Sequence, residues 1–286
     1  MIPALDRLRD AKRVGFLFSG GSSRCVFQVG VVETLHAYGI EPAMCLGVSA
    51  GSWNAAAVAA GNWRRLRPYW RFFSRMPAVD LRNLFAPDGH SPWVWARLHD
   101  RAFRRYVTEN RIRAGLPLYV SLTRLSDKRN VILDVQTAPD PFRVLLASNF
   151  LPPFYTHTPL LDGERYGDGG WSNNAPYEAL FDRGCDMVVL MASKGESEGG
   201  LFRNNADYEH VIPPSVADRV VTIRPRHRLP LPFVERRWEK LAPIANLGAL
   251  RAREVLTGET LPGTEMAAKG KAFTAHVARI RRMLGR

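Results

Sequence analysis

The sequence is poor in cysteine: it contains three, Cys25, Cys45 and Cys185, in 286 residues. An odd and sparse set of cysteines does not provide a disulfide framework for a chain of this length. Each borders an apolar run, so we expect buried free thiols and a reducing, cytoplasmic environment. The sequence also lacks a run of about 18 apolar residues and an apolar segment within residues 1–13, so neither a transmembrane helix nor a secretory signal is predicted.

Acidic residues are scarce relative to basic ones. The chain has 27 Asp and Glu against 40 Lys and Arg, which gives a formal net charge of +13. Such a charge attracts polyanions, so anionic membranes and nucleic acids are both candidate partners, although the charge can also serve solubility alone. No zinc-finger spacing of Cys and His and no aromatic ribonucleoprotein motif is present, so we expect no nucleic-acid partner.

Two short apolar runs, at residues 13–18 and 43–47, are each followed by a glycine-containing turn and a helical pattern. Repeated strand–turn–helix units predict parallel strands joined by crossover helices. Further strands are expected at 116–125, 130–137, 186–192 and 218–225, a short helix at 141–148, and a helical cap over the sheet within 64–117. We expect a single domain over residues 1–286, with a motif-bearing core at about 14–225 and a helical extension at about 233–286.

The turn after the second predicted strand reads G-x-S-x-G, with Ser49 between Gly47 and Gly51. Between a strand and a helix, this pattern presents a serine hydroxyl on a tight turn. The two glycines lack Cβ atoms, so the helix can pack closely against the strand. The helix N-terminus favours the anion that acyl transfer develops on a carbonyl oxygen. The motif alone is weak, and a purely structural turn is the alternative.

A second glycine-containing turn, SGGSSR at residues 19–24, follows the first predicted strand. A dinucleotide-binding loop is a poor match, because G-x-G-x-x-G is absent. The other interpretation is an oxyanion hole, in which Gly20 and Gly21 turn backbone N–H groups toward a substrate oxygen and Arg24 braces the loop or adds positive potential. Turns that follow adjacent parallel strands lie at the same edge of a sheet, so we expect this loop beside Ser49.

The nucleophile needs a proton acceptor, and the best candidate is Asp168 in YGDGGWSNNAP, residues 166–176. Gly169 and Gly170 permit close backbone approach, which would bring the carboxylate against a serine hydroxyl. A dry pocket raises the pKa of a carboxyl group from about 3.9, whereas backbone N–H bonds lower it. A histidine triad is the alternative, because three histidines follow a candidate Asp in the chain order of α/β-hydrolases. These are His210, His227 and His276.

Taken in order, these motifs resemble the patatin-like phospholipase family. The matching segments are SGGSSRCVFQVGVVETL, GVSAGSWNAA, ASNFLPPFY and YGDGGWSNNAP, which lie within residues 14–192. The resemblance implies a three-layer α/β/α fold around a mostly parallel sheet and hydrolysis of lipid acyl esters. It also implies a dyad of Ser49 and Asp168 without histidine, an oxyanion loop of Gly20, Gly21 and Ser22, and no metal or cofactor.

The oxyanion loop departs from the family pattern G-G-G-x-R-G. Ser22 replaces the third glycine and Cys25 replaces the last. A backbone N–H survives either change, but Ser22 pays a conformational cost if the loop requires a positive φ. A non-catalytic or weakly active lipid-binding protein on the same scaffold is therefore a further alternative.

Two segments suggest contact with a membrane surface. Residues 62–75 combine five aromatic side chains with five arginines, and Trp93 and Trp95 follow nearby. The tail at 270–286 has one apolar helical face surrounded by Lys and Arg, with no acidic residue. Aromatic rings and arginines suit the headgroup region of a bilayer. For residues 62–75 the favoured interpretation is an ordinary amphipathic helix that packs on the sheet, and for the tail a helix that covers the core is an equal alternative.

Overall fold

The fold is that of a computed structural model, which describes residues 3–76, 79, 81, 85, 95–152, 160–199, 202–203, 209–210, 212–232 and 234–264. Within these residues the central sheet has eight strands in the order β10-β7-β1-β2-β3-β6-β5, and β4 also pairs with β3. The strands are β1 (Val14–Phe18), β2 (Met44–Val48), β3 (Leu118–Arg124), β4 (Asn130–Asp134), β5 (Leu160–Leu161), β6 (Glu164–Asp168), β7 (Met187–Met191) and β10 (Val220–Ile223). A separate hairpin pairs β8 (Phe202–Arg203) with β9 (Glu209–His210).

Five strands, from β10 to β3, run parallel, and β4, β6 and β5 are antiparallel to their neighbours. The central strands β1, β2 and β7 are buried along their whole length, because they are apolar throughout and helices cover both faces of the sheet. The described helices are α1 (Ala4–Asp10), α2 (Phe27–Ala37), α3 (Ala50–Ala59), α4 (Leu66–Phe73), α5 (Trp95–Tyr106), α6 (Glu109–Ala114), α7 (Pro141–Ala147), α8 (Glu178–Phe181) and α9 (Trp238–Thr257).

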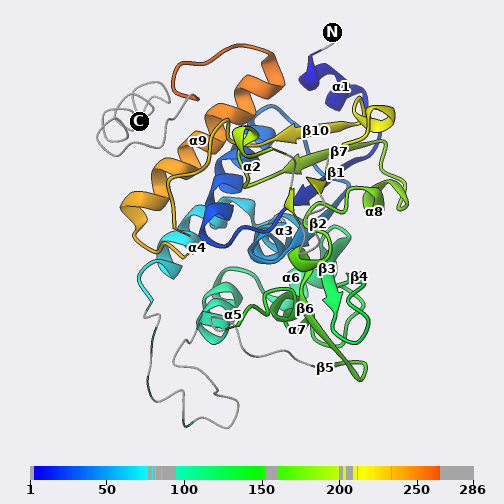
Figure 1. Ribbon diagram of the computed structural model, residues 1–286, viewed down its shortest axis with the longest axis vertical. Coiled ribbons are helices and arrows are strands. Elements are labelled where there is room, and N and C mark those ends of the chain that lie inside the picture. The colour runs from blue at the N-terminus through cyan, green and yellow to red at the C-terminus, as the bar shows by residue number, and fades with distance from the viewer. Residues whose placement is uncertain are drawn as a thin grey trace.

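The core divides at the sheet, since successive strand residues point to opposite faces. Phe16 and Phe18 of β1 belong to the larger apolar cluster, which also contains residues of α2, α3, α4 and α9. Leu17, between them, belongs to a smaller cluster with Leu180 of α8. Figure 1 shows α2 and α9 on one side of the sheet and α8 on the other. The architecture is therefore the expected three-layer α/β/α arrangement around a mostly parallel sheet.

The strands expected from the apolar runs are all present, and the helix at 141–148 corresponds to α7. The predicted helical cap corresponds to α4, α5 and α6, which cover α3. The three expected free thiols, Cys25, Cys45 and Cys185, are free and buried. Helix α9 confirms part of the C-terminal helical prediction and packs along α2, whereas the basic tail at 270–286 lies outside the described residues. The single-domain assignment stays a prediction.

The aromatic residues of 62–75 face inward. Tyr69, Trp70 and Phe73 are no more than 5% exposed, and the Trp70 indole donates a hydrogen bond to Asn54 Oδ1 at 3.0 Å. Trp63 stacks on His36, with ring centroids 4.3 Å apart. Tyr69, Trp70 and Phe73 therefore belong to the core, and Trp63 and Phe72 are partly buried against it. None of the described helices has the length and apolar content needed to cross a bilayer.

Candidate active site

The topology of β3 brings Ser49 and Asp168 together. Strand β4 pairs with residues 119–123 of β3, so it occupies one edge, and both β2 and β6 must share the other. On that shared edge β2 ends with Val48 opposite Ser121, and the antiparallel β6 ends with Asp168 opposite Leu122. The two strands therefore meet end to end, and the serine that follows β2 faces the last residue of β6.

Ser49 forms the sharp turn between β2 and α3. Its backbone has φ 51° and ψ −133°, and it stands at the N-cap of α3. A non-glycine residue with positive φ is strained and is held in place only by its surroundings. A Cβ on Gly47 would lie 2.4 Å from Ser52 Cα, and a Cβ on Gly51 would lie 2.5 Å from the Phe18 carbonyl oxygen. Both glycines are thus required by close packing of α3, as the sequence predicted.

The Asp168 carboxyl group accepts a hydrogen bond from the Gly170 N–H at 2.8 Å, and hydrogen bonding by the Ser49 side chain also lowers its pKa. Its residue is only 5% exposed. Burial raises the pKa of Asp168 to about 6, against the two hydrogen bonds, which lower it. A Cβ on Gly169 would lie 2.2 Å from the Ser121 carbonyl oxygen, so the chain beside the carboxylate approaches β3 closely. The site therefore holds a serine hydroxyl against a carboxylate of enhanced basicity.

The segment after α7 holds the backbone of Ser49. The Ser49 N–H donates to Ser148 Oγ at 2.9 Å, and the Ser148 hydroxyl donates to the Ser121 carbonyl oxygen at 2.8 Å. The Ser49 carbonyl oxygen accepts from Ser52 Oγ at 2.6 Å and from Asn149 Nδ2 at 3.1 Å. These contacts keep the strained turn in place. Sequence reasoning assigned no role to Ser148 or Asn149, although both lie in the matched segment ASNFLPPFY.

The glycine-containing loop lies beside Ser49, as expected. A Cβ on Gly20 would come within 2.9 Å of Ser49 Cβ. The Gly20 N–H, however, already donates to Asn174 Oδ1 at 2.6 Å, and its carbonyl oxygen accepts from Ser193 Oγ at 2.7 Å. The N–H groups of Gly21 and Ser22 have no acceptor among the described residues. They are therefore the two amides of the predicted oxyanion loop that remain available to a substrate oxygen.

Ser22 adopts a φ of 52°, so the serine at the third position of the loop occupies the left-handed region that glycine favours. The loop continues as the 3₁₀ helix η1 (Ser22–Val26) and leads into α2. Arg24 donates to the carbonyl oxygen of Leu231 at 3.4 Å. Of the two roles considered for Arg24, this contact fits bracing of the loop against the connector that precedes α9.

No histidine hydrogen-bonds to Ser49 or Asp168 within the described part of the chain. The backbone of His227 lies against Gly195, and Gly195 belongs to the segment that follows β7. His210 belongs to β9, where its side chain is not described, and His276 lies outside the described residues. The structure thus brings together Ser49, Asp168 and the 20–22 loop, without a histidine among their described contacts. The described residues also include no cluster of three or more His, Cys, Asp or Glu suited to a metal ion.

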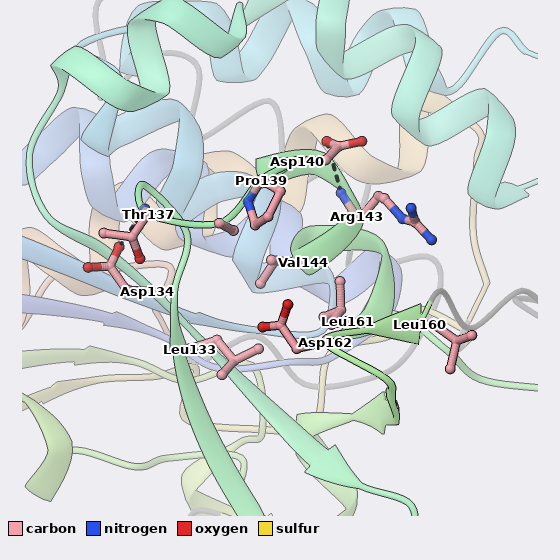
Figure 2. A pocket seen from close by; sticks show the side chains of 11 residues that line it. Leu133, Asp134, Thr137, Pro139, Asp140, Arg143, Val144, Leu160, Leu161 and Asp162 are labelled. Atoms are coloured by element: carbon pink, nitrogen blue, oxygen red, sulfur yellow. Dashed lines mark hydrogen bonds between the residues drawn. The ribbon is translucent and has the colours of Figure 1, made fainter.

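Two surface cavities of about 390 Å³ each lie away from this site. Figure 2 shows the side chains that line the first, which include Asp134, Asp140 and Asp162 together with Leu133 and Val144. It lies at the start of α7, whereas Ser148 follows the end of that helix. The second is lined by α1 and residues 39–43, at the opposite ends of the strands from Ser49. Neither is lined by Ser49 or Asp168.

Comparisons with known proteins relate the chain to one family and to two solved structures. Residues 16–181 match the family model described as patatin-like phospholipase. Among solved structures, VipD from Legionella pneumophila is 12% identical, with a TM-score of 0.53 over 96% of this chain and 75% of VipD. The type III effector protein ExoU is 13% identical, with a TM-score of 0.39 over 96% of this chain and 60% of ExoU. No curated protein matches the chain in sequence.

Proposed function

Because the chain belongs to the patatin-like phospholipase family, we propose that it is a serine lipid acyl hydrolase that uses a dyad of Ser49 and Asp168. The family supports a lipid hydrolase, and the proposal adds the class of bond, a carboxylic ester, and the residues that cleave it. The single observation that carries the assignment is the end-to-end meeting of β2 and β6 along β3, which sets Ser49 against the buried Asp168.

In the first half of the reaction, Ser49 Oγ attacks the ester carbonyl carbon while its proton passes to Asp168. The oxygen of the tetrahedral intermediate becomes negative and accepts hydrogen bonds from the Gly21 and Ser22 amides, next to the N-terminus of α3. The carbonyl then re-forms as the bond to the leaving alcohol breaks, and Asp168 returns the proton to that alcohol. An acyl group remains on Ser49.

In the second half, water attacks the acyl-enzyme and Asp168 takes its proton. The second tetrahedral intermediate releases the fatty acid, and the proton returns to Ser49 Oγ. A pKa of about 6 suits this exchange, because a base works best when its pKa lies near the working pH. The raised pKa therefore supports a carboxylate, without a histidine, as the proton acceptor.

Labelling with a fluorophosphonate probe followed by peptide mapping tests the nucleophile. We expect label on the peptide that contains Ser49, and loss of both label and ester hydrolysis in Ser49→Ala. Ser126→Ala, which removes an exposed hydroxyl bonded to Glu164, is the matched control and keeps both. A folded protein that binds lipid but takes no label would refute the catalytic proposal in favour of a lipid-binding protein.

Substitution of the proton acceptor separates the dyad from a triad. Asp168→Asn should abolish hydrolysis while the protein stays folded, since the amide accepts no proton. Alanine at His210, His227 or His276, one at a time, should leave hydrolysis intact. An inactive but folded histidine variant would establish the triad mechanism instead.

We further propose that the enzyme acts as a peripheral protein on a membrane surface in a reducing compartment. The net charge of +13 supports attraction to anionic lipid, and the three buried free thiols support a reducing setting.

A further inference from the structure

Helices α4 and α5 turn their apolar sides toward the core. On α4 the ring of Tyr69 packs against Phe103 of α5, with centroids 5.4 Å apart. Phe103 also contacts Trp53 of α3 and Phe142 of α7. The described apolar side chains of the two helices are thus buried by packing, which leaves the outer sides free for another role.

The outer sides of these helices carry arginines that have no acidic partner among the residues that the structure describes. Six exposed arginines lie on the two helices or within two residues of the ends of α4. We call them the α4–α5 arginine face. They are Arg64, Arg65, Arg71, Arg75, Arg101 and Arg105. None forms an ion pair with an acidic residue in the described parts of the chain. The Arg105 guanidinium lies 5.7 Å from the centre of the Phe72 ring of α4, which joins the surfaces of the two helices.

Other arginines, including Arg67 of α4 itself, are paired with acidic residues. Arg67 contacts Glu33 at 2.6 Å, Arg113 contacts Glu109 at 2.6 Å, and Arg124 contacts Asp127 at 3.1 Å. Among the arginines of α4 and α5 whose side chains the structure describes, only Arg104 forms such a pair with a residue of its own helix, Asp100, at 2.9 Å. The positive charge of the α4–α5 arginine face is therefore left without compensation by the described residues.

Exposed apolar side chains accompany this charge. The chain between α4 and α5 carries Val79, Leu81 and Phe85, which are 46%, 66% and 88% exposed. Apart from Leu160, they are the only large hydrophobic side chains counted as exposed in the described residues. Aliphatic and aromatic groups gain by entering the boundary of acyl chains, whereas they gain little against the phosphates of a nucleic acid. The combination favours a bilayer over a polynucleotide.

We propose that the α4–α5 arginine face, together with Leu81 and Phe85, docks on bilayers that contain anionic phospholipid. The guanidinium groups bind headgroup phosphates, and the apolar side chains enter the interface. The inference rests on the proposed function, since docking brings a lipid hydrolase to its substrate. Helix α4 packs on α3, which begins after Ser49, and α5 packs on α7, which ends before Ser148. The docked helices therefore contact both elements that hold the nucleophile.

Binding to vesicles tests the surface without relying on catalysis. The protein carries Ser49→Ala, so the vesicles stay intact, and the vesicles are phosphatidylcholine with one third phosphatidylglycerol. The test variant changes Arg71, Arg75, Arg101 and Arg105 to Gln. The control variant changes Arg9, Lys12, Arg143 and Arg165 to Gln, four exposed cations on other elements. Both variants lose the same formal charge, so only its location differs.

We expect the test variant to lose vesicle affinity by on the order of 1,000-fold, because each of the four cations near an anionic surface contributes separately, and the control variant to lose less than about threefold. Equal losses in the two variants, or no loss in the test variant, would overturn the proposal. The proposal would also be overturned if the test variant still bound vesicles but no longer bound poly(A) RNA. With Ser49 restored, both variants should cleave a soluble short-chain ester like the parent protein. If the parent cleaves none, the proposed function fails while the vesicle result still decides the surface.

Discussion

The buried carboxylate of Asp168 should destabilise the folded protein at neutral pH. Its pKa is raised from an ordinary value of 3.8 to about 6, chiefly by burial. The native state therefore holds its proton more tightly than the unfolded chain does. As the pH rises from about 4 to about 6, the unfolded chain ionises first, so the free energy of unfolding falls. Above this window both states are ionised and the full destabilisation of about 3 kcal/mol is present.

Asp168→Asn removes this titration and keeps the shape of the side chain. We expect the variant to gain about 3 kcal/mol over the parent between about pH 4 and about pH 8. Comparing the gain across pH cancels any constant effect of the amide on hydrogen bonding. Urea unfolding of both proteins at a series of pH values measures the difference in their free energies of unfolding. A difference that stays constant with pH would refute the reasoning, because the hydrogen bonds from Ser49 and Gly170 would then offset the burial.

A second variant checks the cause of the shift. The Ser49 side chain lowers the pKa of Asp168 by its hydrogen bond. Ser49→Ala should therefore raise that pKa above about 6 and move the stability change to higher pH. A shift in the opposite direction would mean that the hydroxyl does not stabilise the ionised carboxylate.

Three further substitutions test the packing of the site. Ser148→Ala should lower kcat at least tenfold with little change in KM, since the Ser49 N–H loses its acceptor at 2.9 Å, and Ser148→Thr should restore much of it; a rise in KM alone would argue against positioning. Ser22→Gly should stabilise the protein by about 1 kcal/mol, because φ is 52° at this residue; a lower thermal midpoint would contradict the strain. Gly47→Ala should destabilise by at least about 2 kcal/mol in urea, because its Cβ would lie 2.4 Å from Ser52 Cα; unchanged stability would show that α3 moves freely.

The parts of the fold that the sequence predicted are those with local signals. Buried parallel strands such as β1 and β2 are apolar at every position, and the turn around Ser49 has its glycines where packing requires them. Strand β6 was missed because its sequence, ERYGD, is polar and has no β-branched residue. It is a strand because it pairs with the end of β3, which is a tertiary cause. The motif located Asp168, but only the pairing explains why its carboxylate meets Ser49.

The supporting residues of the site were beyond sequence reasoning for a related reason. Ser148 is 99 residues from Ser49, Asn174 is 154 residues from Gly20, and Ser193 is 173 residues from Gly20. Serine and asparagine are common in loops, so nothing local marks these as partners of the glycine-containing turns. The contact between Asn174 and the Gly20 N–H also changes which amides of the oxyanion loop are available. A glycine pattern identifies a loop able to offer amides, but a single asparagine on another loop decides which amides remain free.

The segment 62–75 shows how one pattern permits two structures. Aromatic residues at helical spacing among arginines fit a helix on a membrane and a helix on a core, because both environments are apolar on one side and polar on the other. The choice depends on whether the rest of the chain provides an apolar surface. Here α3 and α5 provide it, so the rings of Tyr69 and Trp70 turn inward, while the arginines other than Arg67 are exposed. Any membrane contact by α4 must therefore begin with guanidinium groups, and its affinity should fall steeply with added salt.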